Sequence, residues 1–328
     1  MARVFSGMKP TGDATLGSLL GALRHWVDDQ NPDAYYCVVD LHALTAPHDP
    51  VELHRQTIEL ATVFLAVGLD PELCTLFVQS HVHEHTELAW MLECTAAFGE
   101  LRRMTQFKDK SSQSDFVSAG LFTYPALMAA DILLYDTEEV PVGDDQRQHV
   151  ELTRDLANRF NHRFGATFTV PKATIRRAGA RVMDLQDPTR KMSKSEESVA
   201  GTVLLLDDLG ATAKKITRAV TDTGGEVRFD PEGKPGVSNL LSILGACTGE
   251  SPDELAARYT QYGPLKADTA DAVVELLDPI QARYRELAGD RGAVAKILER
   301  GAEKAESVAS VTLARARHNI GLVARGES

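Results

Sequence analysis

The N-terminal stretch FSGMKPTGDATLGSLLGAL, which begins at Phe5, has the composition of a loop that holds a nucleotide. It places four glycines around Pro10, Thr11 and Thr15, directly before a helical pattern. Glycines let the backbone approach a ligand closely, and the first amides of a helix point at any anion placed there. The stretch is neither the dinucleotide fingerprint G-x-G-x-x-G nor the P-loop ending in G-K-S/T, since its one cation, Lys9, precedes the Pro-Thr-Gly turn. It therefore predicts phosphate binding of another kind.

A second stretch that could bind phosphate is RKMSKSEES, in the middle of the chain. Its central residues are Lys191, Met192, Ser193, Lys194 and Ser195. Two ammonium groups with hydroxyls between them suit several phosphate oxygens at once. A solvated basic loop would have the same composition, so this stretch alone leaves both interpretations open.

The first half of the chain alternates between strand-like and helical patterns. Apolar runs rich in β-branched and aromatic residues occur at 2–6, 35–41 and 74–80. Helical patterns separate them, one over 51–67 and another beginning near Thr86. This order predicts an α/β domain whose parallel sheet is covered by helices. Ligands bind such sheets beyond the carboxyl ends of the strands, so the glycine-rich loop after the first strand should lie at the binding site.

The pattern changes beyond Thr202, where strand-like runs stop and long helical segments follow. The expected helices cover 206–220, 237–247, 252–262, 266–288 and 293–319, with a turn-rich linker at 221–236. We therefore expect an α/β domain over 1–200 and a helical domain over 201–290. The remaining segment, 291–328, is expected to be a C-terminal helix that packs back toward the first domain.

Composition excludes several classes of protein. The 328-residue chain carries a net charge of −12, which argues against a protein that binds nucleic acid over its whole surface, including DNA. The segment 172–194 nevertheless holds seven Lys or Arg against two Asp, a local patch suited to a polyanion. No apolar run is long enough to span a membrane, and the N-terminus has no secretory pattern, so we expect a cytoplasmic protein. The four cysteines form no C-x-x-C pair and are expected to be free thiols.

Two polar features inside apolar surroundings could bind a ligand or serve the structure. Asp131 lies within the apolar helical pattern YPALMAADILLY, where a lone carboxylate is costly unless a ligand or a neighbouring donor pairs with it. His81, His83 and His85 alternate in SHVHEHTEL and would share one face of a strand, as zinc ligands could. A helix begins just after them, so the alternation should break, and we expect a polar entry loop without a metal.

Taken together, the motifs resemble a known family. The Pro-Thr-Gly-x-x-Thr-x-Gly loop that opens the first helix, followed by Lys-Met-Ser-Lys-Ser after the sheet, resembles the class I aminoacyl-tRNA synthetases. Three further stretches resemble the bacterial tryptophanyl-tRNA synthetases: GELRRMTQFKDKS at 99–111, TYPALMAADILLYDTEEVPVGDDQRQHVELTRDLANRFN at 123–161, and KPGVSNLL at 234–241. The resemblance covers nearly the whole chain.

The resemblance implies a Rossmann-like catalytic domain over 1–200, including the Lys-Met-Ser-Lys-Ser loop, and a helical domain over 201–290 that binds the tRNA anticodon. It implies that ATP with Mg²⁺ activates L-tryptophan to tryptophanyl-adenylate, releasing pyrophosphate, and that the tryptophan then passes to the 3′ end of tRNA(Trp). It further implies a cytoplasmic homodimer without a structural metal held by the protein.

The same resemblance implies roles for individual residues. The catalytic residues would be Lys191, Lys194 and Thr15. ATP would contact Lys9, Pro10, Thr11, Gly17, Ser18, Lys110, Gly143, Asp144, Asp145, Val182, Lys191, Met192, Ser193, Lys194 and Ser195. Tryptophan would contact Asp131 through its indole N–H, Phe5 and Met128 through its ring faces, Val140 and Val142 beside them, Tyr124 and Gln146 near its ammonium group, and His42.

The sequence departs from the family pattern at three places. Lys9 replaces the usual Gln, Ser18 replaces the usual Asn, and Glu196-Glu197-Ser198 replaces Asp-Pro-Asn. An amide can donate and accept a hydrogen bond, whereas Lys only donates and carries a charge. Lys9 therefore suggests an auxiliary isozyme that tolerates tryptophan-like inhibitors, and neutral drift with Lys9 turned to solvent is the alternative.

Three other functions are compatible with parts of the pattern. A tyrosyl-tRNA synthetase shares the fold and degenerate forms of both signatures. A small-molecule nucleotidylyltransferase uses related loops but has no need of the helical domain. A non-charging paralogue that binds RNA would not need to keep Lys191, Lys194, Asp131 and Asp145.

Overall fold

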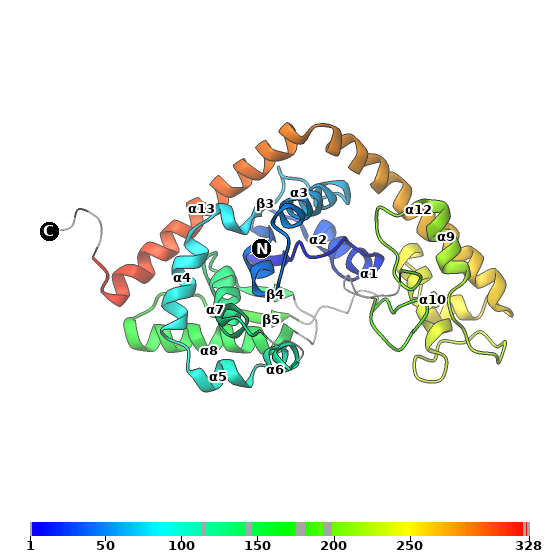
Figure 1. Cartoon of the computed structure of the whole chain (residues 1–328), viewed down its shortest axis with the longest axis horizontal. Coiled ribbons are helices and arrows are strands. Elements are labelled where there is room, and N and C mark those ends of the chain that lie inside the picture. The colour runs from blue at the N-terminus through cyan, green and yellow to red at the C-terminus, as the bar shows by residue number, and fades with distance from the viewer. Residues whose placement is uncertain are drawn as a thin grey trace.

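The computed structural model describes residues 2–112, 116–141, 146–174, 181–192, 199–323 and 326. At its centre lies a parallel sheet with the strand order β3-β2-β1-β4-β5 (Figure 1). The strands are β1 (Val4–Met8), β2 (Ala34–Val38), β3 (Thr75–Val78), β4 (Glu139–Pro141) and β5 (Lys172–Thr174). Every pair of neighbours is parallel, and Val4 is in register with Ala34 on one side and Glu139 on the other. The predicted parallel α/β domain is therefore confirmed.

The strand order reverses at β1, where the chain goes first to one side of the sheet and later to the other. The loop after β1 thus leaves the carboxyl edge at the crevice where sheets of this type bind ligands. That loop is the glycine-rich stretch identified in the sequence, so the topology places it at the expected position.

Alternate residues of the central strands face two separate apolar cores. Tyr36 and Leu76 point into one core, which contains Phe64 of helix α3 (Pro50–Ala66). Tyr35 and Phe77 point into the other, which is built with helices on the opposite face. The sheet is buried on both faces, which is why its strands read as continuous apolar runs.

Helices cover these faces. They are α1 (Leu16–Ser18), η1 (Leu19–Leu23), α2 (Arg24–Asp29), η2 (Leu41–Thr45), α3 (Pro50–Ala66), η3 (Gln79–His81), α4 (Glu84–Glu93), α5 (Phe98–Arg103), α6 (Thr105–Ser111), α7 (Ala119–Leu133) and α8 (Arg147–Phe164). The helix predicted over 51–67 is α3, whose N-cap Asp49 accepts a hydrogen bond from the Glu52 amide at 2.9 Å. The helix expected near Thr86 is α4, which begins two residues earlier, at Glu84.

After Leu204 the described elements are all helices, namely α9 (Leu209–Thr217), α10 (Pro235–Thr248), α11 (Pro252–Ala256), α12 (Tyr262–Gly289) and α13 (Arg291–Ile320). The predicted division between helices over 252–262 and 266–288 is wrong, because α11 ends at Ala256 and α12 already begins at Tyr262. Pro264 lies in the first turn of α12, where a residue without an amide hydrogen costs little. Among the described residues, no helix is long and apolar enough to cross a membrane.

The last two helices form an arch over the molecule, and α13 lies beside β3 and α4 (Figure 1). The approach of α13 to the sheet is close, since a Cβ at Gly301 would lie 1.7 Å from the Leu76 carbonyl oxygen. Arg315 of α13 pairs with Asp136 at 2.7 Å, and Arg317 pairs with Glu87. The C-terminal helix thus contacts the sheet-containing part directly. The division into domains at residues 200 and 290 stays a prediction.

Candidate active site

The glycine-rich loop is fixed by its own threonine and by a later segment. Thr15 is 1% exposed, and its Oγ1 accepts a hydrogen bond from the Ser18 amide at 3.2 Å, capping the first helical turn. The Leu16 amide donates to the Val203 carbonyl at 2.9 Å, so the loop is held to the segment that follows the Lys-Met-Ser-Lys-Ser stretch. Gly12 has a φ of +67°, a left-handed conformation that favours glycine.

The Lys-Met-Ser-Lys-Ser stretch, of which Lys191 and Met192 are described, begins beside this loop. The Met192 amide donates to the Val182 carbonyl at 3.0 Å, and Lys191 is paired with Met183 in an antiparallel bridge. A Cβ at Gly17 would lie 3.6 Å from the Val182 Cβ and 3.7 Å from the Met192 Cβ. Residues 165 or more positions apart in the chain are thus neighbours, as a shared nucleotide site requires. The Lys191 side chain is exposed here, free to reach a phosphate.

Several predicted ATP contacts fall outside the described residues. These are Gly143, Asp144, Asp145, Ser193, Lys194 and Ser195, together with Val142 of the predicted tryptophan pocket and the side chain of Lys110. Of those that are described, Lys9, Pro10 and Thr11 directly follow β1. They therefore lie at the same carboxyl edge of the sheet as Thr15, Gly17 and Ser18.

Asp131 is the centre of a buried polar cluster. Its side chain is almost fully buried, and its Oδ2 accepts a hydrogen bond from His42 Nε2 at 2.7 Å. Its Oδ1 accepts from Gln79 Nε2 at 2.6 Å and from His85 Nδ1 at 2.6 Å. The other nitrogen of His85, Nε2, lies 2.8 Å from the Tyr135 hydroxyl. Asp131 thus holds a fixed position in the core, as its apolar surroundings demand.

The charge on Asp131 is stabilised by its neighbours. Burial by itself would raise the pKa of Asp131, but the charges and hydrogen bonds of His42 and His85 lower it well below its ordinary value. A carboxylate offers about four lone-pair directions. Three are used by His42, Gln79 and His85, so Oδ2 retains the capacity to accept one further hydrogen bond.

Sequence reasoning did not identify Gln79 and His85 as partners of Asp131. The histidine alternation did break at α4, as predicted, and His81 and His83 are exposed whereas His85 is buried. A histidine at the start of the helix predicted near Thr86, in the same chain as an aspartate within an apolar helical pattern, was the available signal for this contact.

The other predicted tryptophan contacts surround this cluster. Tyr124 lies on the same helix as Asp131, its hydroxyl is 2.8 Å from His149 Nε2, and burial raises its pKa to about 12. The rings of Tyr124 and His42 meet edge to face at 6.2 Å. Phe5 is stacked on Tyr135 with ring centroids 5.6 Å apart, which leaves one face of Phe5 for other contacts.

Three further predicted contacts have different exposures. Val140 of β4 is buried and Met128 of α7 is half-buried. Gln146 is half-buried at the N-cap of α8. The geometry thus brings Asp131, His42 and Tyr124 together, and it places Phe5 against their common neighbour Tyr135.

Both groups of residues lie at one edge of the sheet. The glycine-rich loop follows β1, His42 follows β2, and Gln79 and His85 follow β3. The glycine-rich loop and the partners of Asp131 therefore both follow strands of the edge at which parallel sheets bind ligands.

Comparison with known proteins defines the class. The family model described as tRNA synthetases class I (W and Y) matches residues 1–278. The chain therefore belongs to the class I tRNA synthetases for tryptophan and tyrosine.

Individual relatives narrow this assignment. The chain is 56% identical over 329 residues to tryptophan–tRNA ligase 1 of Streptomyces avermitilis, covering 98% of this chain and 99% of that protein. The structure is similar to tryptophanyl-tRNA synthetase from Mycoplasma pneumoniae, with a TM-score of 0.91, 36% identity and 99% of each chain covered. It is also similar to tryptophanyl-tRNA synthetase from Campylobacter jejuni complexed with ADP and tryptophan, with a TM-score of 0.83, 34% identity, and 98% of this chain and 100% of that one covered.

The predicted membership of the bacterial tryptophanyl group is thus confirmed. The tyrosyl and non-charging alternatives are not favoured, because a relative with more than half of its residues identical over nearly the full length is a tryptophan–tRNA ligase.

Proposed function

We propose that this protein is a tryptophan–tRNA ligase that activates L-tryptophan with ATP and transfers it to tRNA(Trp). The observation that carries the proposal is the meeting of Gly17 with Val182 and Met192 at the sheet edge that also holds Asp131. This arrangement offers a nucleotide site and a buried acceptor for an indole next to each other. Membership of the family supports the same reaction.

In the first step, the tryptophan carboxylate attacks the α-phosphate of ATP and pyrophosphate leaves. Placement and electrostatic stabilisation supply the catalysis, so no nucleophilic side chain is needed. The glycine-rich loop would hold ATP against backbone amides, with Thr15 fixing its first turn. Lys191 and Lys194 would neutralise charge on the transferring phosphorus and on pyrophosphate. Mg²⁺ would arrive with ATP, bound chiefly through phosphate oxygens.

Selectivity for tryptophan would come from Asp131. The indole N–H is a donor only, and the remaining lone pair of Asp131 Oδ2 would accept its hydrogen bond. Phenylalanine would leave this buried acceptor unpaired, and sites of this kind reject such analogues by roughly 10⁴-fold or more. His42, Gln79 and His85 hold the carboxylate in place. It therefore would not shift to another donor when the ligand lacks an N–H group at this position.

Lys9 would distinguish this enzyme from relatives with a glutamine at that position. Its ammonium would favour ATP phosphates but would lack the acceptor that a tryptophan analogue without a carboxylate could use. We therefore propose an auxiliary isozyme that tolerates inhibitors which depend on the glutamine.

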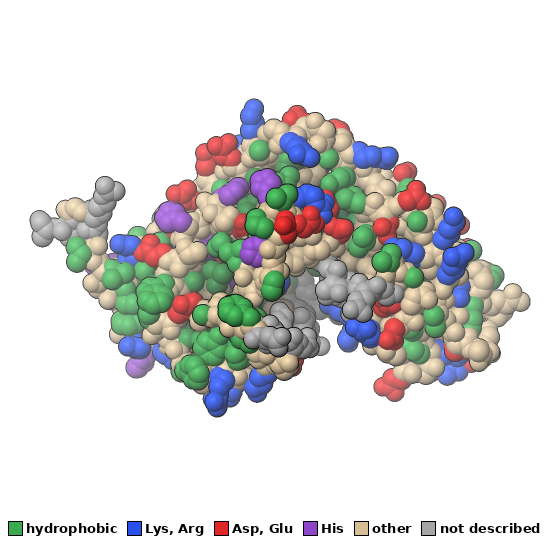
Figure 2. All heavy atoms as spheres, in the orientation of Figure 1, with side chains coloured by type: hydrophobic (Ala, Val, Ile, Leu, Met, Phe, Trp, Pro, Cys, Tyr) green, Lys and Arg blue, Asp and Glu red, His purple; other side chains and the backbone are tan. Residues whose placement is uncertain are grey.

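The helical region after Thr202 would bind the tRNA. The helical segment would contact the anticodon, and the enzyme would act in the cytoplasm as a homodimer with tRNA spanning two subunits. An exposed apolar surface supports the dimer: Trp90 is 66% exposed and Phe98 is 69% exposed. Leu44 and Trp90 also line a surface pocket of about 280 Å³ beside Leu127. Figure 2 shows hydrophobic side chains gathered over α4, α5 and α7 on the visible face.

Pyrophosphate exchange tests the function directly. With radiolabelled pyrophosphate and ATP, exchange should depend on L-tryptophan and should be far weaker with tyrosine or phenylalanine. Charging of tRNA(Trp) should follow in the same preparation. Exchange that responds equally to tyrosine would contradict the assignment, and exchange without tRNA charging would indicate a nucleotidyl transfer of another kind.

A further inference from the structure

Glu84 is a buried carboxylate whose position the reaction does not explain. It is the first residue of α4, it is only 3% exposed, and its buried Oε2 has no hydrogen-bond partner. A buried carboxyl oxygen without a hydrogen bond is costly, so this atom is a candidate to bind a ligand or a cation.

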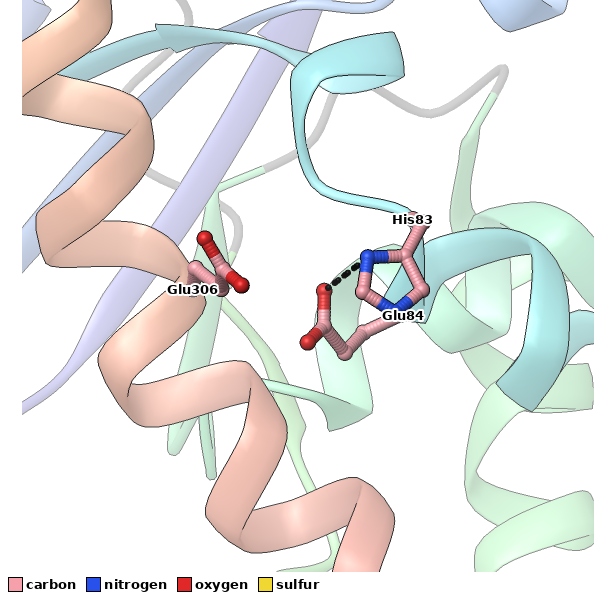
Figure 3. Close-up of side chains that lie close together, drawn as sticks. All are labelled: His83, Glu84 and Glu306. Atoms are coloured by element: carbon pink, nitrogen blue, oxygen red, sulfur yellow. Dashed lines mark ion pairs between the residues drawn. The ribbon is translucent and has the colours of Figure 1, made fainter.

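Two further ligand atoms face this oxygen (Figure 3). His83 Nδ1 lies 3.5 Å from Glu84 Oε2, too far for a good hydrogen bond. Glu306 approaches from the facing helix, α13, and one ligand atom from each of the three residues lies within 4.8 Å of the others. Two carboxylates and an imidazole therefore converge on one point from segments that are more than 220 residues apart.

We propose that His83, Glu84 and Glu306 bind a divalent transition-metal ion of the zinc type at the junction of α4 and α13. One imidazole nitrogen and two carboxylate oxygens form a donor set that zinc uses, with water completing a tetrahedron. Tetrahedral zinc ligands lie about 3.4 Å apart, given bonds of about 2.1 Å. The His83–Glu84 separation already meets this, and the exposed Glu306 side chain can rotate inward.

The choice of metal follows from the ligands. Ca²⁺ and Mg²⁺ prefer sets made wholly of oxygen, whereas the imidazole favours zinc and its neighbours in the transition series. Two carboxylates that face each other repel, and a divalent cation would cancel their charge. This site would be distinct from the Mg²⁺ that accompanies ATP. Sequence analysis predicted no metal here, because the histidine alternation was expected to break at the following helix, and Glu306, which is remote in the chain, was not considered.

A metal here would fasten the C-terminal helix to the core. Glu84 directly precedes His85, which hydrogen-bonds Asp131, while Glu306 lies between Gly301 and the ion-paired Arg315 on α13. The ion would join these two helices at a point where the sheet edge and the arch meet. It would therefore stabilise the position of α13 without touching a substrate.

The test is a titration of tag-free protein, stripped with a chelator, with Zn²⁺ alone. Calorimetry should show one saturable site per chain at micromolar Zn²⁺, and the melting temperature should rise with Zn²⁺. Glu306→Gln and His83→Gln should each weaken binding by at least about tenfold and remove the rise in melting temperature. Both side chains are exposed, so neither variant threatens folding.

The matched controls are Glu303→Gln on α13 and His81→Gln before α4, both exposed and outside the cluster. They should bind Zn²⁺ as the unaltered protein does, and millimolar Mg²⁺ should not displace the ion. Absence of a one-site isotherm, unchanged binding in Glu306→Gln, equal losses in the controls or displacement by Mg²⁺ would each overturn the proposal.

Discussion

At the scale of the residue, the carboxylate of Asp131 should decide which amino acid is activated. Asp131→Asn keeps the shape but turns an amide toward the donors of Gln79 and His85, so it should disturb the acceptor. We expect the ratio of tryptophan to phenylalanine activation to fall about 5- to 150-fold, which corresponds to a loss of roughly 1–3 kcal/mol in selectivity. Pyrophosphate exchange with each amino acid measures it. An unchanged ratio in a folded variant would remove Asp131 from the pocket.

Lys194 should act on phosphate charge and not on the indole. Lys194→Ala is therefore expected to lower the rate of adenylation by about 10²- to 10³-fold while tryptophan binding persists. The exposed Lys214 of α9 provides a control, since Lys214→Ala should leave pyrophosphate exchange unchanged. Parallel losses in tryptophan affinity and turnover would contradict the assigned role.

Lys9 should set the response to inhibitors. In Lys9→Gln, tryptophan analogues that lack the carboxylate should inhibit more strongly, because the amide restores an acceptor and removes a charge. Inhibition constants for the unaltered enzyme and the variant are the measurement. A difference within about twofold, less than roughly 0.5 kcal/mol, would favour neutral drift.

At the scale of the element, Asp222 ties the turn-rich linker to two helices. Its Oδ1 accepts hydrogen bonds from the Tyr262 hydroxyl at 2.7 Å and from Lys234 Nζ at 2.9 Å. Tyr262 begins α12, and Lys234, which is 7% exposed, directly precedes α10. The hydrogen bonds from Tyr262 and Lys234 lower the pKa of Asp222 to about 2. The linker is therefore fixed by a charged contact although its sequence is rich in turns.

This contact predicts an acid-sensitive contribution to stability. The pKa of Asp222 is lower in the folded state than the value of about 3.9 for an unfolded chain. The contribution is therefore complete above about pH 4 and is lost as the pH falls toward 2. Asp222→Asn should lower the melting temperature at neutral pH, and the gap should narrow below pH 4. Asp271→Asn, exposed on α12, is the control. A gap that stays constant with pH would contradict the ion pair.

At the scale of the whole molecule, we expect a second copy of the chain to cover the exposed apolar surface that contains Trp90 and Phe98. Sedimentation at micromolar concentration should give twice the 35.7 kDa mass of the chain. Trp90→Glu should shift the protein toward monomer, because a charge would be buried in the interface. Val311→Glu, at an exposed valine of α13, should leave the mass unchanged. A monomer in the unaltered protein would refute the dimer.

The amino-acid sequence was sufficient to predict the family, the parallel α/β organisation and the positions of most helices. These properties are local, because they depend on the order of neighbouring residues. Examples are the glycine spacing in 5–23, the short apolar runs of the strands, and the helical periodicity of α3 and α13. The two signature motifs predicted a nucleotide site because that chemistry needs specific residues at short spacings. Boundaries such as the end of α11 were missed, since they depend on packing as well as propensity.

The contacts between residues that are distant in the chain could not be predicted from the sequence and became known from the three-dimensional structure. Asp131 takes its partners from η2, η3 and α4, and Gly17 meets Met192, through contacts that no periodicity encodes. The same holds for Glu84 and Glu306, which α13 brings together by crossing back over β3. The physical reason is that a strand or helix records which face is buried, whereas the partner on that face is chosen by the topology of the sheet and by the path of the chain between its elements.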